Sequence, residues 1–146
     1  MSVDSKAEIR IERPKGIVAA FIFDPKNDPL WIVGVNKCFP QTAGLMAKGS
    51  KFERNGTLVG KGYSTTYLVV RDEPGEFVEM TAEDPFQMKI RYDLAEDGDS
   101  TSVRIRLQAF GDLNLQRSAS AVEKAVTESL NADLKKLKSY IENNLN

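Results

Sequence analysis

Hydrophobic and polar residues alternate along most of the chain. The alternation begins at Ala7, Ile9 and Ile11, which stand among charged neighbours, and a period of two is typical of a half-buried β-strand. Asn55-Gly56 is a strong hairpin signal, and short turns of this kind join neighbouring antiparallel strands. Together with the first stretch, the alternating segments predict a seven-stranded antiparallel sheet; they lie at residues 35–41, 50–54, 59–71, 76–82, 86–95 and 101–110.

Two short helical segments are expected between the first and second strands. The apolar residues of segment 15–23 share one side of a helix, and Pro25 prevents its continuation. Residues 28–33 have room for one more helical turn, with Pro29 at its first position. The only tryptophan, Trp31, falls in this turn, and we expect it at the mouth between the short helices and the sheet.

The last third of the chain changes to a helical period. Apolar residues recur every three or four positions over residues 115–145, which predicts one apolar stripe along a long helix. Ser120 and Glu123 resemble a capping box. The stripe continues upstream to Leu115, however, so we expect the helix to begin near Leu113.

These elements predict an α+β fold of the helix-grip type. A curved seven-stranded antiparallel sheet would wrap around the long C-terminal helix, with two short helices between strands 1 and 2. A helix is only about 10 Å wide, so curvature leaves space between it and the sheet. That space is either filled by large side chains or left as a pocket. No linker or repeat interrupts the chain, so residues 1–146 are expected to form a single domain.

The parity of each strand predicts which side chains face this space. The even positions of residues 86–94 and the odd positions of residues 103–109 are apolar. Either parity is possible for residues 59–71. We favour the one that turns Tyr63 and Tyr67 inward, and a bulge can switch it midway. The inward set is apolar and contains no carboxylate.

Composition limits the chemistry. Lys plus Arg number 20 and Asp plus Glu 21, giving a net charge of -1, which argues against nucleic-acid binding. No apolar run approaches the roughly 20 residues of a membrane-spanning helix, and the N-terminus lacks the pattern of a signal peptide. The single cysteine, Cys38, forms neither an intrachain disulfide nor a cysteine metal cluster, which suits a reducing cytoplasm. We expect a cytoplasmic protein, a monomer or weak homodimer, without metal or cofactor.

The absence of histidine weighs against an enzyme. Histidine is the commonest general base and the usual partner of a catalytic nucleophile, and this chain has none. Without histidine to activate it, Cys38 is interpreted as a small apolar strand residue. No catalytic residue is identified from the sequence.

Several sequence phrases resemble the START-type helix-grip superfamily, most of all its polyketide cyclase/dehydrase and lipid-transport branch. They are AEIRIERPKGIVAAFIFDP at 7–25, the tryptophan at 31, GSKF at 49–52, YLVVRDEPGEFV at 67–78, DGDSTSVRIRL at 97–107 and ADLKKLKSYIEN at 132–143. They occur in the family's order and span nearly the whole chain. The resemblance implies the same helix-grip fold and a cavity between the sheet and the long helix.

The resemblance and the apolar inward set favour binding or transport of a small hydrophobic molecule of lipid, polyketide or aromatic type. The cavity would open near the short helices and the loop 43–48. The alternative is a polyketide cyclase/dehydratase-type enzyme that acts by positioning its substrate, with tyrosine donors. A protein-interaction module is a third possibility, hinted at only by Phe110. Filling a plain core is the commoner role of such apolar residues. The candidate ligand-binding residues are Trp31, Phe52, Tyr63, Thr65, Tyr67, Met80, Met88, Ile90, Tyr92, Ile105, Leu107, Val122, Val126 and Leu130.

Overall fold

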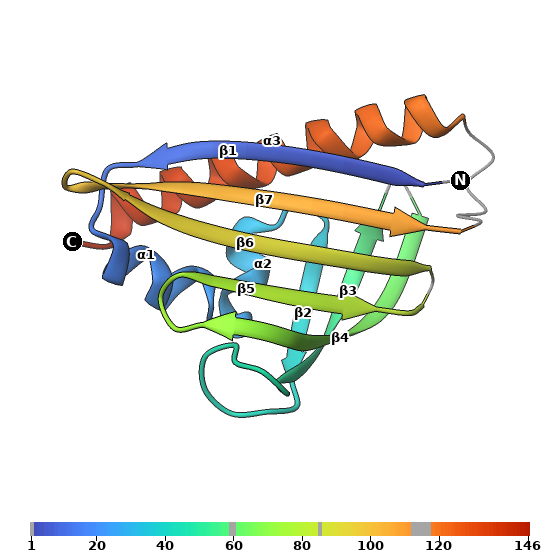
Figure 1. The fold of residues 1–146 in the computed structure, drawn as a ribbon, viewed down its shortest axis with the longest axis horizontal. Coiled ribbons are helices and arrows are strands. Elements are labelled where there is room, and N and C mark those ends of the chain that lie inside the picture. The colour runs from blue at the N-terminus through green and yellow to red at the C-terminus, as the bar shows by residue number, and fades with distance from the viewer. Residues whose placement is uncertain (1, 59–60, 85, 112–117) are drawn as a thin grey trace.

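A curved antiparallel sheet grips one long helix in the computed structural model, which describes residues 2–58, 61–84, 86–111 and 118–146 (Figure 1). The sheet has seven strands in the order β1-β7-β6-β5-β4-β3-β2. The predicted α+β helix-grip fold is therefore confirmed. The strands are β1 (Val3–Ile11), β2 (Val35–Pro40), β3 (Lys51–Leu58), β4 (Lys61–Glu73), β5 (Phe77–Ala82), β6 (Gln87–Asp97) and β7 (Ser100–Phe110).

Short helices connect the two edge strands, β1 and β2. They are α1 (Lys15–Ile22), the 3₁₀ turn η1 (Pro25–Asn27) and α2 (Asp28–Trp31). Helix α1 ends before Pro25, and the Asp24 side chain caps η1 by accepting a hydrogen bond from the Lys26 N–H at 3.1 Å. The two short helices expected from the proline spacing are thus confirmed, with the 3₁₀ turn between them.

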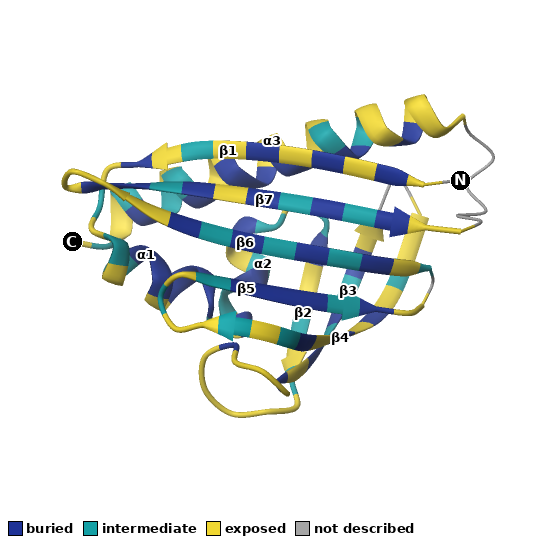
Figure 2. Ribbon diagram, in the orientation of Figure 1, coloured by how far each residue is buried: buried dark blue, intermediate teal, exposed yellow. Residues whose placement is uncertain are grey.

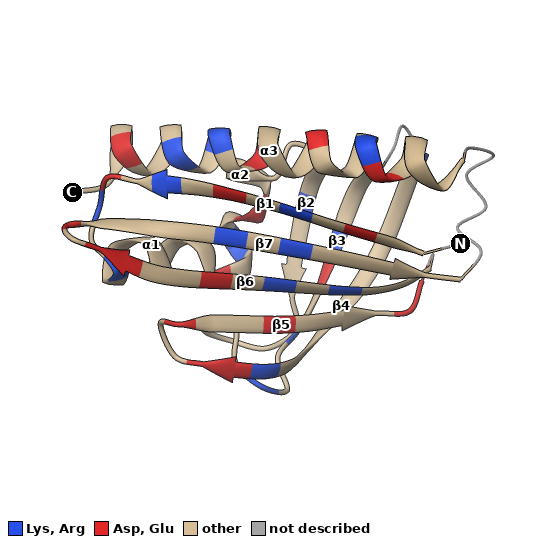
Figure 3. Cartoon of the chain, turned by 45° about the horizontal axis from the view of Figure 1, so that its top comes forward, with Lys and Arg blue, Asp and Glu red and all other residues tan. Residues whose placement is uncertain are grey.

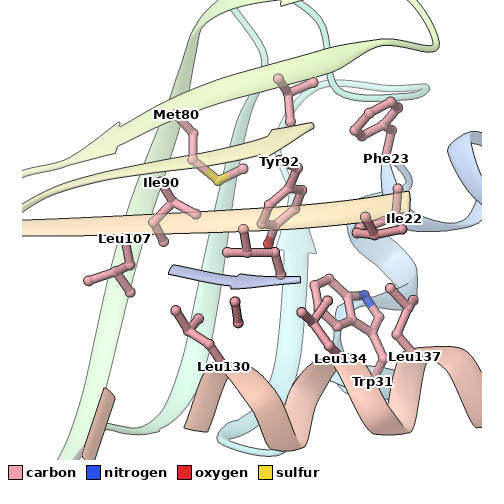
Figure 4. Packing of buried hydrophobic residues seen from close by; sticks show 14 of the residues in the cluster. Ile22, Phe23, Trp31, Met80, Ile90, Tyr92, Leu107, Leu130, Leu134 and Leu137 are labelled. Carbon is pink, nitrogen blue, oxygen red and sulfur yellow. The ribbon is translucent and has the colours of Figure 1, made fainter. Parts of the chain in front are cut away.

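The core lies between the inner face of the sheet and α3 (Ala119–Asn144). Buried and exposed residues alternate along the strands, as Figure 2 shows. The buried stripe of α3 includes Leu130, Leu134 and Leu137, which face the aromatic residues Trp31 and Tyr92 in Figure 4. No helix among the described residues combines the length and apolar character needed to cross a bilayer.

The outer face of the sheet carries charged side chains. Basic residues of β7 lie beside acidic residues of its neighbour β1 (Figure 3). Arg106 contacts Asp4 at 2.7 Å and Arg104 contacts Glu8 at 3.1 Å. Such exposed ion pairs contribute little stability individually. The charged side chains therefore matter mainly because they make the outer face of the sheet polar.

The parity of β4 follows the predicted choice. Thr65, Tyr67 and Val69 are buried, and Tyr63 is half-buried. The register with β5 shifts between Val69 and Arg71, which is the bulge that ends the inward odd series.

Asn55-Gly56 does not form the expected hairpin turn. Both residues lie inside β3, opposite Ser64 and Tyr63 of β4, and the β3–β4 connection lies outside the described residues. A Cβ on Gly56 would stand 1.8 Å from the Gly34 carbonyl oxygen. The glycine therefore serves a close approach between two backbones, not a turn.

Helix α3 begins later than predicted. Its N-cap is Ser118, whose hydroxyl accepts a hydrogen bond from the Ala121 N–H at 3.2 Å. The expected start near Leu113 is therefore wrong, and Leu113 and Leu115 lie outside the described residues. A serine cap satisfies an N–H group of the first turn, so Ser118 marks the start of α3.

Candidate ligand-binding site

A cavity of about 60 Å³ lies between the sheet and α3. Two of its wall residues, Thr57 and Ser129, are exposed, so the cavity opens between β3 and α3. The wall is formed by Trp31, Ile32, Gly34, Arg54, Thr57, Tyr63, Tyr67, Met88, Ile90, Tyr92, Ile105, Leu107, Val126, Ser129, Leu130 and Asp133.

Most of the predicted binding residues lie in this wall. Four others are buried outside it: Phe52, Thr65, Met80 and Val122. Phe52 stacks on Tyr67 with ring centroids 5.4 Å apart and so supports the wall from behind. The predicted residues that do line the cavity are Trp31, Tyr63, Tyr67, Met88, Ile90, Tyr92, Ile105, Leu107, Val126 and Leu130, and their part in ligand binding stays a prediction.

The opening lies elsewhere than expected. The loop at residues 43–48 contributes nothing to the cavity wall; its Met46 is buried, and the Met46 N–H donates to the Phe23 carbonyl oxygen at 2.8 Å. Trp31 is fully buried and is therefore part of the inner wall, not of the mouth. Its ring meets Tyr92 edge-on, with centroids 5.8 Å apart.

A buried ion pair stands at the wall, contrary to the expectation of an interior without carboxylates. Arg54 is 3% exposed and Asp28 is 0% exposed. The Arg54 Nε donates to Asp28 Oδ2 at 2.8 Å, and the Arg54 Nη2 donates to the Tyr92 hydroxyl oxygen at 2.9 Å. Asp28 starts α2, Arg54 comes from the middle of β3 and Tyr92 from β6, so the fold brings together residues far apart in sequence.

Aromatic rings enclose the guanidinium of Arg54. Its Cζ lies 5.2 Å from the Phe52 ring centroid and 4.7 Å from that of Tyr67. A desolvated cation over an aromatic face gains electrostatic stabilisation from the ring. The arginine is thus held in a defined position at the cavity wall.

The electrostatics keep the site's tyrosines protonated and its arginine charged. Burial works against the charged form of Arg54, but Asp28 and the neighbouring tyrosines raise its pKa above the ordinary value. Burial also raises the pKa of Asp28, and Arg54 opposes part of that rise. Burial raises the pKa of Tyr63 to about 12, and those of Tyr67 and Tyr92 also rise. At neutral pH these hydroxyls are hydrogen-bond donors.

Cys38 belongs to the surroundings of this pair. Its Sγ lies 3.7 Å from Asp28 Oδ2. Burial and the adjacent carboxylate raise the pKa of the Cys38 thiol to about 12, so it is neither a thiolate nor a nucleophile at neutral pH. Among the described residues, no group of acidic and cysteine side chains is placed to hold a metal ion.

A second carboxyl group, Asp133 of α3, also lines the cavity. It is 6% exposed, and its Oδ1 accepts a hydrogen bond from the Val33 N–H at 2.9 Å. Burial raises the pKa of Asp133 to about 6, although the Val33 hydrogen bond and Arg54 oppose the rise.

The sequence carries weak signals for these missed residues. Arg54 has the same parity as Phe52 in β3, and Asp133 follows Leu130 by three positions on the apolar stripe. Periodicity therefore places both on inward faces. Their charge, however, is typical of solvent-exposed positions. Periodicity and charge therefore disagree, and only the hydrogen-bond partners present in the folded chain show that both residues are buried.

The curved sheet, the gripped helix and the cavity between them define the START-like class of helix-grip proteins. Similar solved structures include a START superfamily protein from Mycobacterium smegmatis, at 16% identity and a TM-score of 0.82 over 96% of this chain and 97% of that one. The protein TTHA0849 from Thermus thermophilus shares 13% identity at a TM-score of 0.80, over 98% and 99% of the two chains. The di-domain ARO/CYC StfQ from the steffimycin biosynthetic pathway shares 12% identity at a TM-score of 0.77, over 98% of this chain and 52% of that one.

The family follows from the sequence. The model of the family described as "Polyketide cyclase / dehydrase and lipid transport" matches residues 2–142, and the chain belongs to this family. The resemblance seen in the sequence phrases is thereby confirmed. No protein of curated function matches the chain. Membership of this family supports a fold that binds hydrophobic ligands.

Proposed function

We propose that the protein binds, and carries, a small hydrophobic molecule with an oxygen acceptor in the cavity between its sheet and α3. The observation that carries the proposal is the buried Arg54, held at an otherwise largely apolar wall by Asp28 and Tyr92. The apolar part of the wall suits a hydrocarbon or aromatic body. The arginine suits a carbonyl, phenol or carboxyl oxygen.

A buried ion pair is energetically unfavourable as a mere filling of the core. Removing two charges from water costs several kcal/mol per ion, and well-packed apolar residues often serve stability as well or better. The bonds to Asp28 and Tyr92 do not exhaust the N–H groups of a guanidinium, which has more donors than any other side chain. A role toward a ligand accounts for an arginine at this position.

The cavity must widen to receive a guest. Its volume of about 60 Å³ suits a few water molecules. Met88 lies in the wall and has an unbranched, easily rearranged side chain, and the opening beside Ser129 is bordered by exposed residues. We therefore expect the side chains of Met88 and of the residues around the opening to move when a ligand binds.

Two matched one-ring probes test the proposal. Acetophenone and ethylbenzene have similar size, but only acetophenone carries an oxygen acceptor. Calorimetric titration is expected to show binding of both to the wild type, with acetophenone about tenfold tighter. In the double variant Asp28→Leu/Arg54→Met, which removes the charges together, the preference should disappear. Failure of both probes to bind, together with no apolar molecule extracted from the purified protein, would contradict the proposed function.

A second candidate function is catalysis of the cyclase/dehydratase kind. The specific observation in its favour is that Arg54 bonds to Tyr92 and lies over Tyr67, so donors converge on one wall. Donors fixed in this way stabilise a developing oxyanion. The experiment is turnover of a linear poly-β-ketone probe. Tyr67→Phe/Tyr92→Phe should lower kcat by at least about tenfold in protein that circular dichroism shows to be folded, and unchanged turnover would exclude this mechanism.

A further inference from the structure

Asp133 differs from the other charged residues of the cavity wall. Arg54 is balanced by Asp28 at 2.8 Å, so that pair contributes no net charge. Asp133 is 6% exposed, and no ion pair joins it to a described residue. Its Oδ1 accepts from Val33, whereas its Oδ2 has no hydrogen bond within the described part of the chain.

The Val33 hydrogen bond does not explain why the residue is an acid. An asparagine side chain has a carbonyl oxygen that accepts the same N–H, and it carries no charge to be desolvated. The neighbours along α3, Leu130 and Leu134, point toward the core in Figure 4. A carboxylate on this face is unfavourable for the empty protein unless something in the cavity pairs with it.

We propose that Asp133 binds a hydrogen-bond donor of the ligand, and that a protonated amine is the group that fits it best. This inference rests on the proposed function of the cavity and adds the chemical class of the guest. The guest would have an apolar body, an oxygen acceptor at Arg54 and an amine, or more weakly a hydroxyl, at Asp133. Both residues line the same cavity.

The net charge of the wall points the same way. With Arg54 neutralised by Asp28, ionised Asp133 leaves the cavity negative. An amine gains a charge-assisted hydrogen bond there, which is stronger than a neutral one. A carboxylate guest would instead meet an uncompensated like charge, although Arg54 lies nearby.

Three probes of matched size test the inference: 2-phenylethylamine, 2-phenylethanol and phenylacetate. We expect calorimetric titration of the wild type at pH 7.5 to give an affinity about tenfold higher for the amine than for the alcohol. In Asp133→Asn the amine and the alcohol should bind within about twofold of each other. Glu128→Gln, the same acid-to-amide change at an exposed position of α3 outside the cavity wall, should keep the wild-type preference.

The outcomes separate the inference from the proposed function. Equal binding of the amine and the alcohol to the wild type, or an amine preference that survives in Asp133→Asn, would overturn the role of Asp133 and leave the cavity as a binding site. Tightest binding of phenylacetate would overturn it as well. Binding of none of the three would contradict both. A thermal unfolding curve for Asp133→Asn confirms that the variant is folded.

Discussion

The Asp28–Arg54 pair shows how much one residue depends on its partners. Both side chains are almost completely removed from water and are joined at 2.8 Å. The attraction offsets the desolvation of each charge only while both are present. Asp28 Oδ1 has no hydrogen-bond partner among the described residues, so even the intact pair is incompletely satisfied.

Arg54→Met should therefore be strongly destabilising. It leaves the carboxylate of Asp28 buried without its cation, which costs about 3–5 kcal/mol of unfolding free energy. Asp28→Leu/Arg54→Met removes both charges and should be much closer to the wild type. Urea denaturation measures both, and an Arg54→Met loss no larger than that of the double variant would contradict this account.

Asp133 should make stability depend on pH. Its pKa is raised from 3.8 in the unfolded chain to about 6, so the folded state holds the proton more tightly. The stabilisation is complete below about pH 4 and is lost as pH rises through 6. The groups that act on this carboxyl are the Val33 N–H, Arg54 and Lys136.

Comparison with Asp133→Asn isolates this effect from the other acidic residues. The variant should gain about 2–3 kcal/mol relative to the wild type between pH 4 and pH 7, because asparagine does not ionise. Urea unfolding at a series of pH values provides the measurement. A difference that does not change with pH would show that the Asp133 pKa is ordinary in the folded protein.

At the scale of whole elements, the sequence predicted most of the structure. Alternation located every strand, and the proline spacing located both short helices. The predictions of elements failed where one sequence motif is compatible with two local structures. Asn55-Gly56 is a typical hairpin pair, but here Gly56 allows the backbone of β3 to approach Gly34, and only the pairing of β2 with β3 reveals this.

Gly56→Ala should disrupt this approach. The added Cβ would lie 1.8 Å from the Gly34 carbonyl oxygen, so the backbone at the cavity rim must move. We expect a loss of at least about 2 kcal/mol in urea unfolding, together with weaker binding of acetophenone.

Gly62→Ala is the matched control, because its added Cβ would meet nothing closer than 4.0 Å. This variant should stay within about 0.5 kcal/mol of the wild type, as substitutions on open surface usually do. Equal losses in the two glycine variants would mean that backbone freedom in β3 and β4, and not the close approach to Gly34, sets the requirement.

At the scale of the whole molecule, the curvature of the sheet connects the sequence to the cavity. A sheet bent around one helix cannot be filled everywhere, and the cavity lies where β3, β4 and β6 face α3. This much follows from the order of elements. The charges at the cavity do not, because Arg54 and Asp133 of the wall and Asp28, the partner of Arg54, come from three elements. They acquire their properties only when these elements meet.

The single tryptophan makes the whole molecule testable as one unit. Trp31 is fully buried in the cavity wall and contacts Tyr92, so its fluorescence reports both unfolding and occupancy. For a single domain, the urea transitions followed by Trp31 fluorescence and by far-ultraviolet circular dichroism should coincide. Acetophenone at about 100 times its Kd should raise the free energy of unfolding by about 2.7 kcal/mol, and both signals should report the same increase. A fluorescence transition that precedes the other would show that the cavity opens as a separate unit.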